Sequence, residues 1–387
     1  MDIRIEGECD PRFLAVKQAF AENFVSRAEL GAALCVMIDG RSVVDLWGGH
    51  VDKLRTRPWA PDTLVNVYST TKGVTALCAH RLVDEGRLDL DAPVARYWPA
   101  FAQNGKQRVL VRHLLNHQAG LPAIRKPLPG EALFDWTAMT DALAAEEPWW
   151  EPGTAHGYHA MTFGWLVGEV VRQVAGKTIG AYFRDELATP LGLDFHIGLP
   201  EKDWARVAGL RPAPPPNPGD RTLLFEIIAK PDGMTAKAFV NPLTGLMPGL
   251  VSSPEWRRAE LPAMNGHATA RAVARIYGAL ATDGRLDGTR VLSPEGIERA
   301  RKEQTNGRDR VLLEHTRFSA GFMLPVPGAT FGPNPRAFGH PGMGGSLGFA
   351  DPEARLAFGY TMNKMGGSIL VDARPAALID ALYGALK

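Results

Sequence analysis

Residues 67–74 read VYSTTKGV, and the rest of the chain is interpreted outward from them. Apolar side chains recur at helical spacing over residues 74–82, so the stretch predicts a helix that starts near Ser69. Three residues make about one helical turn, so Ser69 and Lys72 project from the same face. A serine at a helix start also lies beside free backbone N–H groups and the positive end of the helix dipole, which favour an oxyanion there.

The spacing of Ser69 and Lys72 has two interpretations. In the first, Ser69 is an N-capping serine and Lys72 is solvated, which is the usual meaning of this spacing in isolation. In the second, a lysine pressed against serine in a poorly solvated cleft loses part of its reference pKa of about 10.4 and can accept a proton. The second interpretation requires another proton-handling group and an oxyanion hole elsewhere in the chain.

Two later segments supply candidates for these parts. Residues 151–160 read EPGTAHGYHA and lead into apolar residues at helical spacing, so Tyr158 is expected in a turn just before a buried helix. A turn that leads into a buried helix holds the phenol of Tyr158 rigidly. Residues 339–346 read GHPGMGGS and place glycines and a polar side chain at an expected strand edge, where a backbone N–H can approach a substrate closely.

These three segments, in this order, resemble the serine β-lactamase and penicillin-binding family, nearest its class C branch and the family VIII carboxylesterases. The S-x-x-K motif maps to Ser69 and Lys72, and the tyrosine of the second motif maps to Tyr158. The third motif, Lys-Thr-Gly in lactamases, maps to residues 340–342, which read HPG. Supporting phrases are RHLLNHQAGLP at residues 112–122 and GFADPE at residues 348–353, and the resemblance spans about residues 30–365.

The resemblance implies a role for each residue of the predicted machinery. Ser69 is the acylated nucleophile and Lys72 its close base. Tyr158 passes the proton to the leaving group and then activates the deacylating water. The backbone N–H groups of Ser69 and Met343 form the oxyanion hole.

Several residues in or beside these motifs indicate which class of substrate the site accepts. Ala160 stands where lactamases keep an asparagine, and His340, a titratable histidine, replaces the lysine that holds a β-lactam carboxylate. His340 is expected to support Tyr158 or the substrate, and Gly342 is assigned to the same supporting group. Trp149 and Trp150 precede the second motif, and for them the lining of an acyl pocket and packing in the core are equally open.

These departures favour a serine hydrolase that cleaves small carboxylic esters through an acyl-enzyme on Ser69. A β-lactamase or D-amino-acid peptidase, and an acyltransferase to a small alcohol or amine, share the Ser-Lys-Tyr machinery and stay open. The non-enzyme alternative is a catalytically inactive, ligand-binding relative, which fits poorly because all three catalytic side chains are present. The sequence names neither the natural acyl and alcohol groups nor the oligomeric state.

A second serine motif needs a separate interpretation. Residues 344–348 read GGSLG and match G-x-S-x-G, the nucleophile elbow of α/β-hydrolases. That elbow lies between a strand and a helix and has a histidine downstream. Here a strand and a turn are expected to follow, and no histidine occurs after His340. We therefore interpret the motif as glycine packing and do not take Ser346 as the nucleophile.

The composition excludes several classes of function. Lys and Arg total 43 against 42 acidic residues, and no basic tract is concentrated anywhere, so no nucleic-acid partner is expected. No apolar run approaches the ~20 residues of a membrane span, and the charged start lacks a signal-peptide core, so no membrane association and a cytoplasmic location are expected. Three cysteines without paired spacing argue against a disulfide framework and a zinc site. Histidine pairs at 113/117 and 156/159 lack an HExxH pattern, so neither a metal nor another cofactor is expected.

The distribution of expected elements indicates an α+β fold, β-lactamase-like by the resemblance. An antiparallel sheet flanked by helices is built from both termini, and a mainly helical domain lies between them. The predicted division places residues 1–75 and 285–387 in the sheet domain and residues 76–284 in the helical domain, with a loop-rich insertion near 211–262. The active site is expected at the junction, where pockets commonly form. The individual expectations are helices at 11–30, 268–280 and 375–386, a hairpin around residues 39–40, strands at 318–326, 345–349 and 356–362, and a stiff proline-rich segment at 213–218.

Overall fold

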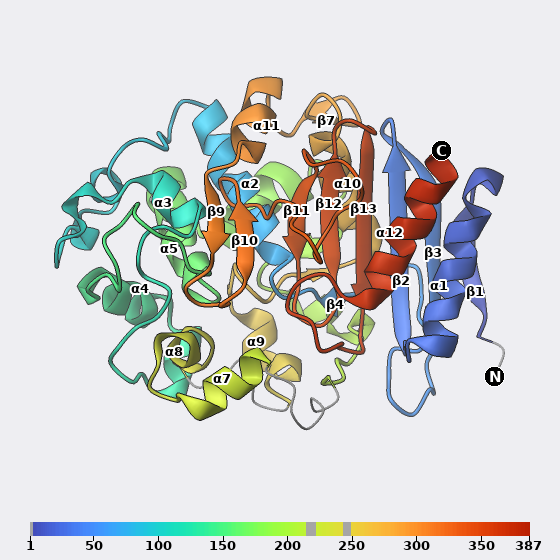
Figure 1. The fold of residues 1–387 in the computed structure, drawn as a ribbon, viewed down its shortest axis with the longest axis horizontal. Coiled ribbons are helices and arrows are strands. Elements are labelled where there is room, and N and C mark those ends of the chain that lie inside the picture. The colour runs from blue at the N-terminus through green and yellow to red at the C-terminus, as the bar shows by residue number, and fades with distance from the viewer. Residues whose placement is uncertain (1–2, 214–221, 243–248) are drawn as a thin grey trace.

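The computed structural model describes residues 3–213, 222–242 and 249–387, and its centre is a six-stranded sheet. The strands are β1 (Ile5–Cys9), β2 (Gly31–Ile38), β3 (Arg41–Gly49), β11 (Phe338–Pro341), β12 (Leu347–Asp351) and β13 (Leu356–Met362). Their order is β1-β3-β2-β13-β12-β11, and every neighbouring pair is antiparallel. Strands β2 and β13 come from opposite ends of the chain and pair at the middle of the sheet (Figure 1), so the prediction of a sheet built from both termini is confirmed.

Helices cover both faces of this sheet. Helices α1 (Leu14–Ser26) and α12 (Ala373–Leu386) lie side by side on one face, and α10 (Ala270–Leu280) packs on the other (Figure 1). Successive strand residues point to opposite faces. Accordingly Leu34 and Val36 pack in the core with α1 and α12, whereas Cys35 packs in the core with α10. Both faces are apolar, so these central strands read as continuous hydrophobic runs.

Helix α10 approaches the sheet very closely at two glycines. A Cβ atom at Gly359 would lie 2.4 Å from Ala270 O and 2.6 Å from Ala274 N, and one at Gly348 would lie 2.4 Å from the Tyr277 ring. Only glycine leaves room at these distances, for the helix backbone at Gly359 and for the Tyr277 ring at Gly348. The predicted boundary at residue 284 assigns α10 to the helical domain, but the helix packs on the sheet. The two-domain division itself stays a prediction.

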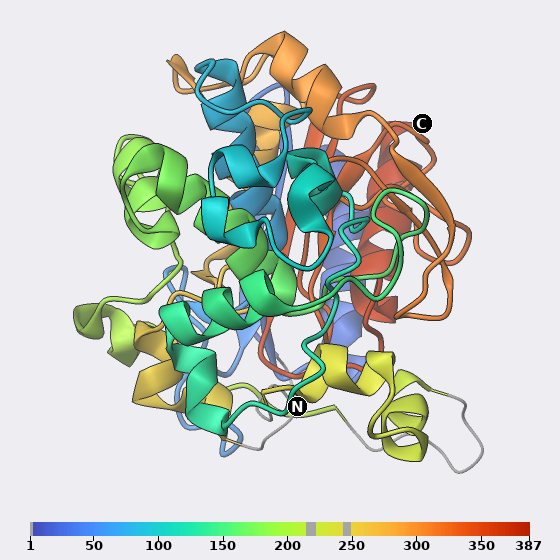
Figure 2. The same cartoon turned by 90° about the vertical axis from the view of Figure 1, so that its left-hand side faces the viewer.

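The remaining helices lie mostly beyond the β11 edge of the sheet, and Figure 2 faces them. They are α2 (Thr71–Asp84), α3 (Val111–Leu115), α4 (Trp136–Ala145), α5 (Thr162–Ala175), α6 (Ile179–Phe183), α7 (Leu223–Ala229), α8 (Met234–Val240), α9 (Pro254–Arg258) and α11 (Pro294–Arg301). Helix α2 contacts α5, α6 and α11 as well as β11. It is buried along most of its length, as a helix surrounded by other elements must be. The S-x-x-K helix therefore lies at the junction of the sheet and the helices.

Some predicted elements differ from the structure. The helix expected at 11–30 is a short 3-10 turn followed by α1. The strand expected at 318–326 is wrong, because β10 (His315–Phe318) ends there after pairing with β9 (Thr305–Arg308). The chain then turns at Gly321, whose φ is +95° and whose added Cβ would lie 2.3 Å from Ala76. The proline-rich segment at 213–218 lies, apart from Ala213, outside the described residues. Short strands complete the fold: β4 (Val65–Asn66), β5 (Phe195–His196), β6 (His267–Ala268), β7 (Arg285–Leu286) and β8 (Thr289–Arg290).

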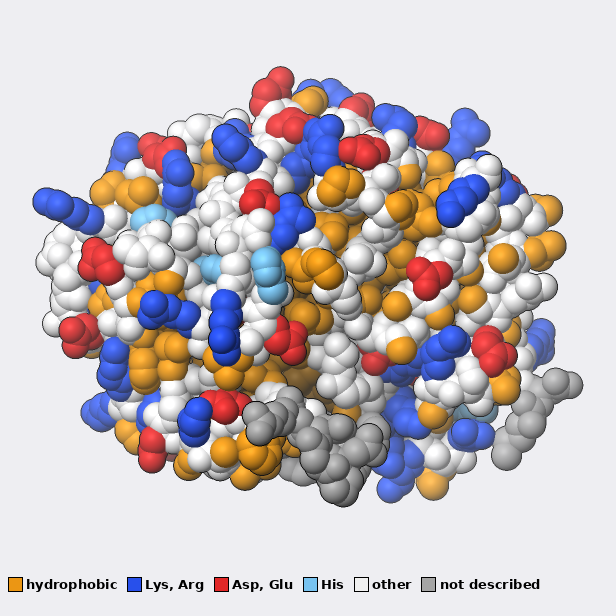
Figure 3. Space-filling model, in the orientation of Figure 1, with side chains coloured by type: hydrophobic (Ala, Val, Ile, Leu, Met, Phe, Trp, Pro, Cys, Tyr) orange, Lys and Arg blue, Asp and Glu red, His pale blue; other side chains and the backbone are white. Residues whose placement is uncertain are grey.

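The structure also shows the lengths of the helices, the distribution of surface charge and the state of the three cysteines. In the described segments, no helix combines the length and the apolar composition that a bilayer crossing requires. Basic and acidic side chains are interspersed on the face that Figure 3 shows. Cys35 and Cys78 are free thiols buried in the core, and Cys9 is a free, partly exposed thiol at the end of β1. Burial raises the pKa of the Cys35 thiol to about 12.

We predict that Gly359→Ala destabilises the protein by about 1–3 kcal/mol, because the new methyl group meets helix backbone that cannot rotate aside. Gly384→Ala is the matched control, since Gly384 lies in α12 and an added Cβ would meet nothing within 4 Å. The control should be neutral or stabilise by up to ~1 kcal/mol through helix propensity. Urea unfolding followed by circular dichroism measures both, and equal free energies of unfolding for the two variants would contradict the packing argument.

Candidate active site

The nucleophile candidate lies on a strained turn that leads into α2. Tyr68 has a φ of +43°, unusual for a residue with a side chain. Ser69 follows it and is partly exposed, whereas its neighbours Tyr68 and Thr70 are buried. Thr71 N donates to Tyr68 O at 3.0 Å and Lys72 N donates to Ser69 O at 2.9 Å, which closes the first turn. This turn presents the Ser69 hydroxyl from an otherwise buried segment.

Lys72 approaches Ser69 as the helix spacing predicts. Its Nζ lies 3.2 Å from Ser69 Oγ. The same Nζ donates to Ala160 O at 2.7 Å and to Ala263 O at 3.0 Å. Three chain segments that are distant in sequence therefore meet at one amine.

The surroundings of Lys72 disfavour a positive charge. The side chain is fully buried, and within the described residues it forms no ion pair with a carboxylate. Nζ lies 4.8 Å from the centre of the Tyr158 ring and 5.8 Å from that of Phe163. Burial lowers the pKa of Lys72 well below its ordinary value of 10.5. The interpretation of Lys72 as a solvated lysine is thus excluded by its position.

Tyr158 precedes α5, as expected, and its ring is held on several sides. It stacks on Phe318 with ring centres 6.1 Å apart, and it lies 5.0 Å from the ring of His117. Burial raises the pKa of the Tyr158 phenol, and a hydrogen bond with Ser69 opposes part of that shift. The phenol therefore stays protonated at neutral pH, within hydrogen-bond reach of the nucleophile.

Asp309 is a residue of this site that the sequence did not indicate. It is fully buried, and its Oδ1 accepts hydrogen bonds from Tyr158 N at 3.0 Å and from Val311 N and Leu312 N at 2.8 Å. Its Oδ2 accepts one from the Thr316 hydroxyl at 3.2 Å. The carboxylate fixes the backbone of the Tyr158 turn, and its charge further raises the pKa of the phenol. No local pattern signals such a contact, because a lone Asp in a loop usually caps its own turn.

Two backbone N–H groups near the nucleophile are left without partners. Among the described residues, neither Ser69 N nor Met343 N donates a hydrogen bond, although Gly342 N, Gly344 N and Gly345 N all do. Unpaired N–H groups are uncommon in folded proteins. They are the donors that the resemblance implies for the oxyanion hole.

His340 lies in the site in a different state from the one expected. It is buried, and its Nδ1 donates to Pro341 O at 2.8 Å, which leaves Nε2 as an acceptor. Within the described part of the chain, Nε2 has no hydrogen-bond partner. Burial and the nearby Lys72 lower the pKa of His340 to about 3. The expectation of a histidine that titrates near neutral pH is therefore wrong, because burial penalises the imidazolium.

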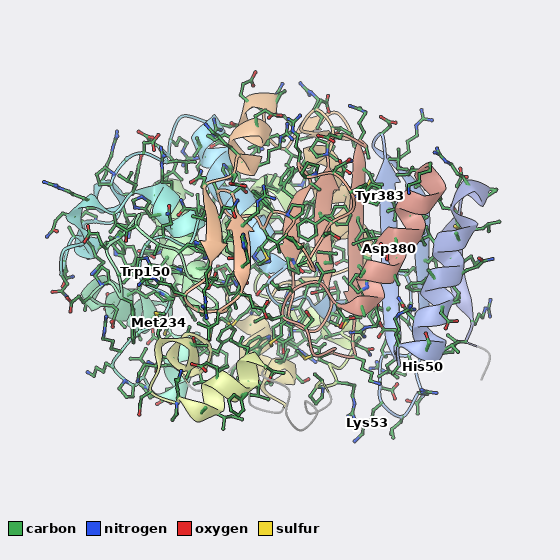
Figure 4. The ribbon with its side chains drawn as sticks, viewed as in Figure 1. His50, Lys53, Trp150, Met234, Asp380 and Tyr383 are labelled. Carbon is green, nitrogen blue, oxygen red and sulfur yellow. The ribbon has the colours of Figure 1, made fainter. Side chains whose placement is uncertain are left out.

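The two tryptophans occupy different environments. Trp149 is partly exposed, its Nε1 donates to Ala123 O at 2.8 Å, and it packs on the apolar cluster that contains Tyr158. Trp150 is buried and meets the ring of His159 edge-on at 6.1 Å. Figure 4 places Trp150 on the helical side of the molecule, above Met234 of α8. Trp150 is thus a buried side chain and Trp149 a partly exposed one, and the assignment of either to an acyl pocket stays a prediction.

The other residues singled out from the motifs, Gly342, Ser346 and the paired histidines, pack or form hydrogen bonds within the fold. Gly342 packs so closely on the nucleophile segment that a Cβ would lie 2.2 Å from Val67 O. Ser346 is buried and precedes strand β12 rather than a helix, so it lacks the setting of a nucleophile elbow. His117 Nδ1 accepts a hydrogen bond from His159 N, and His156 Nε2 lies 2.9 Å from the Thr316 hydroxyl. The described residues contain no cluster of three or more side chains that could hold a metal ion.

Comparisons with known proteins identify the family of this chain. The beta-lactamase family matches residues 16–382 of the chain. The esterase/beta-lactamase LipL of Mycobacterium tuberculosis is 40% identical over 378 residues, which cover 94% of this chain and 83% of that protein. A family VIII carboxylesterase structure has a TM-score of 0.91 and 44% identity, over 99% of this chain and 100% of its own. A penicillin-binding protein homologue from Caulobacter crescentus has the same TM-score, identity and coverage.

The match extends over nearly the whole chain, and the resemblance expected from the three motifs is confirmed. The fold as a whole is similar to those two solved structures, each with a TM-score of 0.91. The chain belongs to the beta-lactamase family.

Proposed function

We propose that this protein is a carboxylesterase that cleaves small esters through an acyl-enzyme on Ser69. The observation that carries the proposal is the buried Lys72 amine, 3.2 Å from Ser69 Oγ and without a carboxylate partner among the described residues. The similarity to LipL, which is named an esterase/beta-lactamase, and to a family VIII carboxylesterase supports the same reaction class.

Lys72 is suited to act as the base for Ser69. A neutral amine has two N–H donors and one lone pair, and the carbonyls of Ala160 and Ala263 accept the two donors. The lone pair is then left for the Ser69 hydroxyl proton. In acylation, Ser69 Oγ attacks the ester carbonyl carbon as its proton passes to Lys72 Nζ.

Tyr158 is suited to carry the proton onward. Because the pKa of its phenol is raised, the phenol still carries its proton when the strongly basic alkoxide departs. It gives that proton to the alkoxide and regains one from the Lys72 ammonium. The C–O bond of the ester breaks, the alcohol leaves, and the acyl group stays on Ser69. A water molecule then attacks the acyl carbon, and its proton passes through the same groups to Ser69 Oγ. The bond from the acyl carbon to Oγ breaks, the carboxylic acid leaves, and the Ser69 hydroxyl is restored.

The proposed oxyanion hole consists of Ser69 N–H and Met343 N–H. Both donors lack other partners within the described residues, so they are available to the tetrahedral intermediate. Fixed donors of this kind act without reorganising when the charge develops.

The surroundings of the site favour neutral esters over β-lactams. Ala160 offers no side-chain amide, and its carbonyl is already bonded to Lys72. His340 is neutral at physiological pH, so it provides no cation for a substrate carboxylate. Trp149, Met234 and Phe239 are partly buried against the cluster that contains Tyr158, which supports an apolar acyl group.

We predict that Ser69→Ala abolishes hydrolysis of p-nitrophenyl butyrate, and that Lys72→Ala and Tyr158→Phe each lower kcat at least ~100-fold through lost proton transfer. Tyr182→Phe is the matched control, because Tyr182 is buried in α6 with a hydroxyl that has no partner in the described residues. A fluorophosphonate should add once, at Ser69, as peptide mapping would show. Labelling of Ser346, or a folded Tyr158→Phe protein with normal kcat, would overturn the assignment.

The pH dependence of kcat/KM follows from the lowered pKa of Lys72. Activity should fall as the pH drops through that pKa, because the ammonium form cannot accept the Ser69 proton. His340, with a pKa of about 3, should add no limb between about pH 5 and 8. We therefore expect His340→Gln to keep the shape of the profile. A limb near pH 6.5 that disappears in His340→Gln would show that His340 titrates in the working range.

We predict that catalytic efficiency on p-nitrophenyl butyrate exceeds that on nitrocefin and on a first-generation cephalosporin by at least ~100-fold. Each missing charge-assisted contact to a β-lactam is worth roughly 1.5–3 kcal/mol, or about one to two decades of rate. The three substrates are compared in one buffer with one enzyme preparation. Equal efficiency on ester and β-lactam would favour a β-lactamase instead.

A further inference from the structure

The serine of the G-x-S-x-G motif makes a contact that packing alone does not require. Ser346 is buried, and its Oγ donates to Val67 O at 2.7 Å. The same Oγ lies 3.2 Å from Thr70 Oγ1. Val67 and Thr70 flank Ser69 on either side. One hydroxyl of the third-motif loop is therefore bonded to the segment that presents the nucleophile.

The loop that carries Ser346 is a tight turn around Met343. Gly342 N donates to Ser346 O at 2.7 Å, and Gly345 N donates to Gly342 O at 3.0 Å. Met343 lies inside this turn, and its N–H has no partner among the described residues. The orientation of that N–H is therefore set by how the turn is held rather than by a hydrogen bond of its own.

The far side of the same loop is held by a buried ion pair. Arg374 Nη2 donates to Gly344 O at 2.7 Å. The Arg374 guanidinium is in turn bonded to Glu29 at 3.0 and 3.1 Å and to Asp372 at 2.7 Å. Glu29 and Arg374 are almost completely buried. This anchor fixes the loop to the sheet and α12, but it does not connect the loop to Ser69.

We propose that Ser346 is a positioning residue that sets the separation of the two oxyanion-hole donors, Ser69 N–H and Met343 N–H. The inference rests on the proposed function. Arg374 holds the loop from outside, and the Ser346 hydroxyl draws it onto the nucleophile segment at Val67. Donors of an oxyanion hole must lie about 2.7–3.1 Å from the developing oxyanion, and a displacement of about 1 Å can cost ~100-fold in rate.

The test is Ser346→Ala, measured on p-nitrophenyl butyrate and on butylboronic acid. The boronic acid forms a B–O bond to Ser69 Oγ and places a boron-bound oxygen where the oxyanion develops. We expect kcat to fall about 10-fold with little change in KM. The inhibition constant of the boronic acid should rise by the same factor, because both quantities depend on the same two donors.

Ser319→Ala is the matched control, because Ser319 is fully buried and its hydroxyl also donates to a backbone carbonyl, Phe322 O at 3.3 Å. It should lose stability comparably but keep its kcat and its boronic acid affinity. Ser346→Cys retains a buried side chain with a weaker donor and should give a smaller loss of kcat than Ser346→Ala. It also serves as the test variant if Ser346→Ala does not fold.

The outcomes separate this inference from the proposed function. A wild-type protein without esterase activity would remove the proposed function, and the inference with it. An active wild type together with unchanged kcat and boronic acid affinity in a folded Ser346 variant would overturn the inference alone. An equal loss of kcat in Ser319→Ala would also overturn it, since the effect would then be general destabilisation.

Discussion

The amine of Lys72 is buried and pairs with no carboxylate among the described residues, and the rest of the site is arranged around that constraint. Burial disfavours the ammonium form and lowers the pKa of Lys72 well below its ordinary value, and the N–H donors of the amine must find acceptors. They find Ala160 O and Ala263 O, which belong to two separate segments that both follow α2 in the sequence. Gly164 allows the close approach, since a Cβ there would lie 2.7 Å from Ala263 N. The chemistry of one side chain thus depends on the packing of three segments.

A buried carboxylate, Asp309, is held apart from the Lys72 amine. Asp309 is satisfied by three backbone N–H groups and a hydroxyl, and Tyr158 is the residue whose backbone it holds. The amine environment favours loss of a proton, and the phenol environment favours its retention. Groups whose surroundings push their pKa values in opposite directions can serve as base and acid in one site. Carbonyl oxygens surround the amine and backbone N–H groups surround the carboxylate, so neither needs the other as a counter-ion.

The parts of the site that follow from local sequence could be predicted. Helical periodicity alone predicts that Ser69 and Lys72 lie on one face of a helix. The apolar pattern after residue 160 alone predicts that Tyr158 lies in a turn before a helix. Asp309 and Arg374 could not be found this way, because each acts through hydrogen bonds to backbone distant in the sequence. The neutral state of His340 also escaped prediction, since burial is a property of the whole fold. The strand expected at 318–326 failed where Gly321 must turn the chain against Ala76.

The pairing of β2 with β13 has a consequence for how the protein is made. These two strands form the middle of the sheet, yet they lie almost a chain length apart in sequence. During synthesis, β2 and β3 leave the ribosome as a hairpin long before the strand that completes their other edge. The unpaired edge of β2 stays open to incorrect partners until β13 has been synthesised, and such long-range pairing is intrinsically slow. Completion of the sheet therefore depends on β13 reaching β2, a step that involves none of the catalytic residues.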